Sequence, residues 1–134
     1  MDSGANVIYF ERMNNSFLNS IEIAMLKAET STGLPFSTKV LEELASSSLP
    51  GIVHILGIVT FEGGLPITTL DGTHIGSIGV SGASAEDDGI CAQIAIDCID
   101  VHLRWIIKNQ KSTSKYQPAF WGLQTAVVYQ QIST

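Results

Sequence analysis

The chain has 134 residues, enough for a single domain with one hydrophobic core, and its formal net charge is −6 at pH 7. This acidity argues against nucleic acid as a partner, because proteins that bind nucleic acid need a basic face. Hydrophobic residues make up 45% of the chain and charged residues 15%, which favours a homo-oligomer that hides apolar surface between subunits. The sequence has neither the run of about 20 apolar residues that a membrane span needs nor a signal peptide, so we expect a cytoplasmic protein without a membrane partner.

One strand and two helices are predicted in the first third of the chain. Residues 6–13 (NVIYFERM) have the β-branched and aromatic content of a strand. Ser16 is a suitable N-cap for a helix that ends at Gly33. Residues 37–45 (STKVLEELA) predict a second, shorter helix.

The middle of the chain is predicted to be β-rich. Residues 51–61 (GIVHILGIVTF) are typical of a strand, although Gly57 interrupts them. Two further apolar runs, residues 65–70 and 74–82, flank the dipeptide Asp71-Gly72. Apolar runs on either side of Asp-Gly are a strong signal for a β-hairpin.

The last predicted helix begins after Ser84, and Asp87 three residues later completes a capping box. Cys91 and Cys98 are expected on the buried face of this helix, as small hydrophobic residues too far apart to form a disulfide. Residues 123–131 (LQTAVVYQQ) predict a final strand. The order of elements indicates an α+β fold, with helices packed on an antiparallel sheet.

Glycines are concentrated between residues 63 and 88, which raises the question of a nucleotide-binding loop. A dinucleotide loop needs its glycines between a strand and a helix, whereas Gly76, Gly79 and Gly82 fall inside a predicted strand. A P-loop needs a lysine after the last glycine, but acidic residues follow here. With both readings excluded, the glycines either permit bending and close helix packing or form the floor of a ligand site.

Four motifs together resemble one known family. They are ERM at 11–13, IAMLKAETSTG at 23–33, GGLPI at 63–67 and IGSIGVSGASAEDDGICAQIAI at 75–96. In this order they resemble the GlcG/HbpS-like family, the so-called haem-degrading domains, over roughly residues 1–100. The resemblance implies a profilin-like α+β sandwich that forms dimers or larger oligomers. It also implies haem as the candidate cofactor, since members include haem-binding proteins and domains attached to cobalamin-related enzymes.

The chain departs from the family pattern at both ends. The family pattern begins with a helix and a strand that would precede Met1, and it ends near residue 100. On this reading one domain spans residues 1–134, with a family-like core at 1–100 and a helix extension, linker and terminal strand at 101–134. We expect TAVVYQQ (125–131) to pair with residues 6–12, in its own subunit or in a neighbour, as a permuted or swapped strand.

The first functional hypothesis is a protein that binds haem or another flat organic ligand in a cleft beside the glycine-rich strand. Lys27, which matches the helical lysine of the family, and Arg12 would meet anionic groups, and His54 or His74 would coordinate iron. Each has a structural alternative, such as a solvated helix lysine, a core histidine or an exposed hairpin residue. The predicted ligand-binding residues are Arg12, Lys27, His54, His74, Gly63, Gly64, Gly79 and Ser81.

The second hypothesis is an enzyme that uses the same pocket for acid/base chemistry on a small metabolite, such as an isomerisation or cyclisation. The predicted proton-handling residues are Lys27, Glu62, His54 and Asp88. For Asp88 the structural alternative is helix capping. The sequence lacks the histidine and cysteine spacings of a zinc site, so no metal site is predicted. A structural or accessory subunit, with glycines that serve packing alone, is the third reading.

Overall fold

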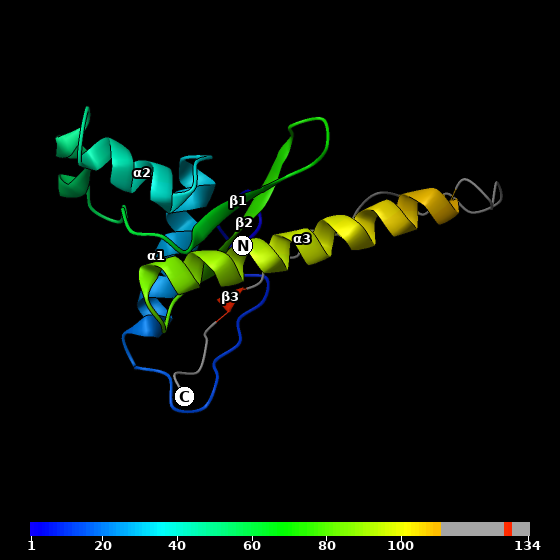
Figure 1. Ribbon diagram of the computed structural model, residues 1–134, viewed down its shortest axis with the longest axis horizontal. Coiled ribbons are helices and arrows are strands. Elements are labelled where there is room, and N and C mark those ends of the chain that lie inside the picture. The colour runs from blue at the N-terminus through cyan, green and yellow to red at the C-terminus, as the bar shows by residue number, and fades with distance from the viewer. Residues whose placement is uncertain (111–127, 130–134) are drawn as a thin grey trace.

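A computed structural model describes residues 1–110 and the short strand at 128–129 (Figure 1). Three α-helices, one 3₁₀ helix and three strands make up this part of the chain. In chain order they are α1 (Ser20–Gly33), α2 (Thr38–Ala45), η1 (Pro50–His54), β1 (Gly64–Thr68), β2 (His74–Val80), α3 (Ala85–Gln110) and β3 (Val128–Tyr129).

The sheet has the order β1-β2-β3. β1 and β2 form the predicted antiparallel hairpin, and the turn between them is closed by Asp71, whose carboxylate accepts from the Thr73 amide at 3.2 Å. Gly72 at the turn has φ +84°, which glycine adopts without strain. β3 pairs in parallel with the end of β2, at Gly79 and Val80.

Helices cover both faces of the hairpin. Side chains alternate between these two faces along each strand. Ile78 and Val80 are fully buried against Ala92 of α3 on one face. Ser77, on the opposite face, donates its hydroxyl to Ala28 O of α1 at 2.7 Å. Figure 1 shows α3 crossing the hairpin and continuing well beyond it. The predicted α+β class, with helices packed on an antiparallel sheet, is confirmed.

A pair of glycines lets α1 lie directly on the sheet. Gly64 and Gly79 are register partners on β1 and β2. A Cβ atom at Gly79 would collide with Ala24 O, and one at Gly64 would collide with Lys27 O. Backbone therefore meets backbone at this point, as the packing interpretation of the glycine-rich strand predicts.

Two predicted strands do not form. Residues 6–13 run without regular structure, and a strand needs a partner that this segment does not find among the described residues. In the second segment (51–61), residues 51–54 belong instead to η1, which begins at Pro50. Gly57, at φ +84°, then turns the chain. The first helix also begins later than predicted, because Asn15 adopts φ +67° and Ser16 lies in a turn in which its hydroxyl donates to Met13 O at 2.6 Å.

The edge of β2 that β3 joins also receives the first residues of the chain. The Met1 amine donates to Ser77 O at 2.8 Å, and Asp2 forms an isolated bridge with Gly76. Within one chain, the described part of the tail pairs with β2 and not with residues 6–12, so the predicted pairing inside the subunit is wrong there. Pairing with residues 6–12 of a neighbouring subunit stays a prediction. The rest of that tail lies outside the described residues.

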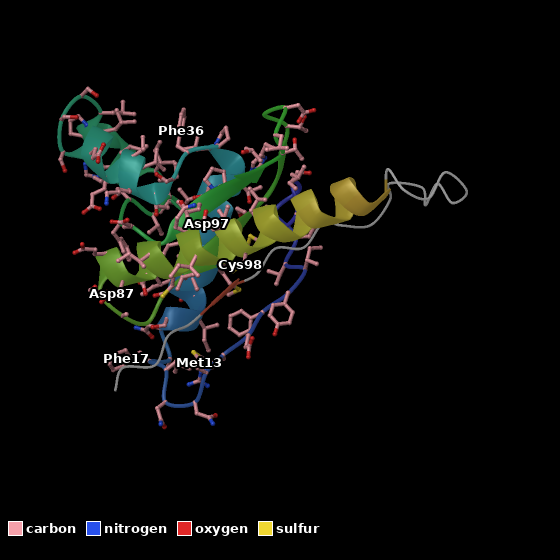
Figure 2. All side chains as sticks on the ribbon, turned by 45° about the vertical axis from the view of Figure 1, so that its right-hand side comes forward. Met13, Phe17, Phe36, Asp87, Asp97 and Cys98 are labelled. Carbon is pink, nitrogen blue, oxygen red and sulfur yellow. The ribbon has the colours of Figure 1, made fainter. Side chains whose placement is uncertain are left out.

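The cysteines of α3 behave differently from each other. Cys91 is half-buried and packs against the core between β2 and α3, whereas Cys98 is exposed. The prediction that both lie on a buried face is wrong for Cys98, because the side of α3 that contacts the core carries Ala92, Ala95 and Ile96, and Cys98 lies off this side. Figure 2 shows Asp97 and Cys98 on this part of α3, well apart from Met13 and Phe17 near the start of the chain. Within the described residues, none of the helices combines the length and apolar character that a membrane crossing requires.

Candidate functional site

A buried ion pair joins α1 to the start of α3. The side chain of Lys27 on α1 is fully buried, and its Nζ donates to Asp88 Oδ2 at 2.8 Å. The same ammonium group donates to Val80 O, at the end of β2, at 3.0 Å. Lys27 thus links three elements through one nitrogen atom.

Gly63 makes room for this nitrogen. It has φ +127°, and a Cβ atom there would lie 2.6 Å from Lys27 Nζ and 2.6 Å from Val80 O. Both the backbone conformation and the close approach therefore require glycine. The first glycine of the GGLPI motif leaves space for the lysine amine, and the second, Gly64, allows α1 to pack closely on the sheet.

An aromatic ring covers another side of the ammonium group. The centroid of the Phe61 ring lies 4.8 Å from Lys27 Nζ, within the range of a cation–π interaction. Phe61 is itself 40% exposed. One aromatic ring therefore separates the buried cation from the surface on this side.

Asp88 is held from two sides. Its Oδ1 accepts from the Ala83 amide at 3.1 Å, while Oδ2 accepts from Lys27. The predicted cap is carried by Ser84, whose Oγ accepts from the Asp87 amide at 3.1 Å. Asp88 therefore bonds the backbone just before α3 through Oδ1 and is the buried partner of Lys27 through Oδ2.

Burial and charge act on Lys27 in opposite directions. Removal from water lowers the pKa of its amine, because the charged form loses its hydration. The hydrogen bond and negative charge of Asp88, and the charge of Glu62, raise the pKa, but burial outweighs them. Lysines with a lowered pKa beside a carboxylate are concentrated at functional sites.

Glu62 forms the outer part of the cluster. Its carboxylate receives Lys39 Nζ at 3.0 Å in a partly exposed ion pair, and this pairing raises the pKa of Lys39. The Glu62 side chain rests on the first turn of α3, where a Cβ atom on Gly89 would collide with it. We refer below to Lys27, Phe61, Glu62 and Asp88 as the Lys27 cluster.

His74 lies at the other end of β2. It is half-buried, yet its Nε2 is a buried atom with no hydrogen-bond partner. His74 and Val80 are the first and last residues of β2. At about 3.3 Å per residue the strand separates them by roughly 20 Å. Because Lys27 contacts Val80, His74 and Lys27 cannot both contact the same reacting atom.

The other predicted residues lie elsewhere. His54 is exposed on η1, and Arg12 is exposed and donates to Ser16 O at 3.1 Å. Ser81 is buried at the end of β2, and Gly64 and Gly79 lie beneath α1. Among the described residues, no hydrogen bond or ion pair connects Arg12, His54 or His74 to the Lys27 cluster. Of the predicted set, the structure brings together Lys27, Gly63, Glu62 and Asp88.

Sequence reasoning missed Phe61 and the carbonyl of Val80. Phe61 closes an apolar run that was expected to be a strand, so its ring had no reason to be placed over a charge. Its position directly before Glu62 and the GGLPI motif is the signal that could have drawn attention to it. A main-chain acceptor such as Val80 O leaves no signal in a sequence.

Comparison with known proteins identifies this α+β domain. Residues 1–97 match the HbpS-like family of haem-degrading proteins. The chain therefore belongs to the HbpS-like family, as its motifs predicted.

Three relatives illustrate the range of proteins that share this domain. An uncharacterised 15.0 kDa protein from the dhaT-dhaS intergenic region of Citrobacter freundii is 36% identical over 102 residues, which is 73% of this chain and 71% of that protein. The corrinoid adenosyltransferase PduO of Salmonella typhimurium is 38% identical over 94 residues, which is 67% of this chain and 28% of PduO. The crystal structure of a PduOC–haem complex is 35% identical, with a TM-score of 0.65 and 72% of each chain covered.

Proposed function

We propose that the protein binds a small organic ligand, that this ligand is haem or a similar flat molecule, and that His74 would hold the iron of a bound haem. Membership of the HbpS-like family and the likeness to a haem complex support the ligand class. The observation that carries the choice of residue is the buried Nε2 of His74, which has no partner.

An unpartnered buried nitrogen is costly to a fold, by about 1–3 kcal/mol. Among the described side chains, Ser31 Oγ is the other buried atom without a partner, and it lies beneath α2 and β1, where Gly64 approaches it. Histidine is a frequent axial ligand of haem iron, so a ligand at His74 would use the nitrogen that the protein leaves unsatisfied. When bound, haem would supply an iron centre beside the hairpin, and His74 would hold it in place.

A haemin titration of the full chain tests this assignment, with the Soret band as the readout. We expect a Soret shift with the natural sequence, loss of the shift in His74→Ala, and no change in His54→Ala, because His54 is exposed on η1. Absence of any shift with the natural sequence would overturn haem binding. A shift that is lost in His54→Ala and kept in His74→Ala would overturn the choice of His74.

The Lys27 cluster supports a second candidate function, acid/base catalysis on a small metabolite. A lysine with a lowered pKa lies 2.8 Å from a carboxylate, which is the distance over which a proton is passed. Exchange of a carbon-bound hydrogen for solvent deuterium, followed by NMR over a panel of small metabolites, tests it. Exchange should be lost in Lys27→Met and kept in Lys39→Met, and the same rate in both variants would rule it out.

We also propose that the protein is a homo-oligomer. Large apolar side chains are exposed over α2, η1 and their flanks, and Leu56 is 99% exposed. A surface of this kind is typical of protein that becomes buried in an interface. The exposed members of this surface, called here the α2–η1 surface, are Phe36, Val40, Leu49, Val53, Ile55 and Leu56.

A further inference from the structure

The amine of Lys27 has two hydrogen-bond acceptors and one aromatic cover. Asp88 Oδ2 lies 2.8 Å from Nζ and Val80 O lies 3.0 Å away, so two of its sides are taken by protein oxygen atoms. The Phe61 ring occupies a third side and is 40% exposed. Phe61 is therefore the partly exposed group that lies against the buried amine.

We propose that Lys27 is a nucleophile that condenses with a small neutral aldehyde or ketone to form a Schiff base, with Asp88 as its proton carrier. A buried lysine amine is well suited to this reaction, because its unprotonated form attacks carbonyl carbon. The lowered pKa of Lys27 enlarges the unprotonated fraction. The direct contact with Asp88 provides an acceptor for the ammonium proton at 2.8 Å.

The reaction balances without an oxidant or reductant. The Lys27 ammonium gives one proton to the Asp88 carboxylate, and the free amine adds to the carbonyl carbon to form a carbinolamine. Asp88 then returns its proton to the hydroxyl group of the carbinolamine, which leaves as water. The products are a protonated imine on Lys27, one water molecule and the Asp88 carboxylate, with the same total charge as the reactants.

The charges around the cluster favour a neutral carbonyl compound. Asp88 and Glu62 both act on Lys27, and Glu43 and Glu86 lie close enough to influence Lys39 beside Glu62. Carboxylates outnumber lysines in this set, so a carbonyl compound that carries its own carboxylate would meet repulsion. Haem binding at His74 is independent of this chemistry, since His74 lies at the far end of β2.

Reductive trapping of the full chain separates nucleophilic chemistry from plain acid/base chemistry. The protein is incubated with butanal and cyanoborohydride at neutral pH, and the modified lysines are located by peptide mass mapping. We expect Lys27 to be alkylated faster than the exposed Lys39, because burial lowers the pKa of Lys27 whereas the hydrogen bond to Glu62 raises that of Lys39. Modification of Lys39 and other lysines while Lys27 stays unmodified would overturn the proposal.

Two matched comparisons test the site without a change to Lys27 itself. Phe61→Ala should speed the labelling of Lys27, whereas Phe36→Ala, another half-exposed phenylalanine, should leave it unchanged. 4-Oxobutanoate, a carboxylate-bearing aldehyde of the same chain length, should label Lys27 about tenfold more slowly than butanal, because one close charge repulsion suffices for that factor. Equal labelling by the two aldehydes, or equal rates in the two phenylalanine variants, would contradict the proposed site.

Discussion

Lys27 Nζ and Asp88 Oδ2 lie 2.8 Å apart, and the two side chains are 0% and 4% exposed. One residue comes from the first helix and the other from the first turn of the last, so the pair connects the two layers that enclose the hairpin. Two charges in such a place lose most of their hydration. Their mutual attraction offsets this free-energy cost only while both partners are present. The pair is therefore important for stability, and it also holds an amine and a carboxylate in direct contact away from solvent.

The first prediction concerns the loss of one partner. Lys27→Met should lower the free energy of unfolding by about 3–5 kcal/mol, because Asp88 would remain buried without a counter-charge. Urea unfolding followed by circular dichroism measures this. The double variant Lys27→Met/Asp88→Leu should recover much of the loss, since an apolar pair removes the unpaired charge.

The exposed pair offers a control for this measurement. Lys39→Met removes an ion pair whose lysine is 54% exposed, and solvent screens such a pair. Its effect on stability should be small. An equal loss in Lys27→Met and Lys39→Met would contradict the structural importance of the buried pair.

The second prediction tests the contact between α1 and the sheet. Gly79→Ala should lower stability by about 1–3 kcal/mol or more, because the new methyl group would force apart the backbones of α1 and β2. Gly33→Ala is the matched control, since nothing lies within 4 Å of a Cβ atom there. Thermal unfolding compares the two variants. If both melt at the same temperature, the close approach of α1 at Gly79 is absent.

The third prediction isolates the steric role of Gly63. Gly63→Ala and Gly72→Ala both place alanine at positive φ, at +127° and +84° respectively. Only Gly63→Ala also pushes against Lys27 Nζ, at 2.6 Å. We expect the larger loss of stability in Gly63→Ala, together with a change in the NMR signal of the Lys27 side chain. An undisturbed Lys27 signal in Gly63→Ala would exclude this contact.

The fourth prediction is that the two lysines of the site titrate in opposite directions. The pKa of Lys27 lies below its ordinary value of 10.5 because of burial, and that of Lys39 lies above 10.5 because of its bond to Glu62. A pH titration of the lysine side chains by heteronuclear NMR measures both. Titration of Lys27 at or above the midpoint of Lys39 would contradict the described environment.

These shifts also set the pH dependence of stability. Since folding lowers the pKa of Lys27, its contribution to stability is complete above 10.5 and is lost as the pH falls through the folded value. Since folding raises the pKa of Lys39, its contribution is complete below 10.5 and is lost as the pH rises through the folded value. Unfolding of Lys27→Met and Lys39→Met across this pH range should therefore diverge from the natural sequence in opposite senses.

The fifth prediction concerns the α2–η1 surface. If this surface is covered in a homo-oligomer, Leu56→Lys should shift the protein toward the monomer in analytical ultracentrifugation, because a charge would enter the interface. Leu70→Lys, at the tip of the hairpin, is the control, since Leu70 is exposed but lies outside that surface. A natural sequence that sediments as a monomer at high concentration would contradict the proposal.

Elements with strong local signals could be predicted from the sequence. The Asp71-Gly72 turn gave the hairpin, and Ser84 gave the start of α3, because turns and caps depend on neighbouring residues. Residues 6–13 and 51–61 have strand composition but are not strands, since a strand also depends on a partner that composition does not reveal. Cys98 was expected beside Cys91 on the buried side of α3, but the core contacts of α3 continue through Ala95 and Ile96, and Cys98 is exposed.

The candidate site was predictable as a set of residues but not as an arrangement. Lys27 and Asp88 were each expected from separate motifs, and their contact spans 61 positions of sequence. His74 and Lys27 were expected to share one ligand. His74 instead begins β2, whereas the amine of Lys27 contacts Val80 at the other end of that strand. That separation depends on the direction of the strand between them, which the motifs do not encode.

The claim that two separate sites lie near opposite ends of β2 is tested most directly by haemin titration of His74→Ala and Phe61→Ala side by side. His74→Ala removes the unpartnered nitrogen at one end of the strand, and Phe61→Ala alters the Lys27 cluster at the other. We predict that the Soret shift is lost in His74→Ala and unchanged in Phe61→Ala. A shift that survives in His74→Ala but disappears in Phe61→Ala would contradict the account.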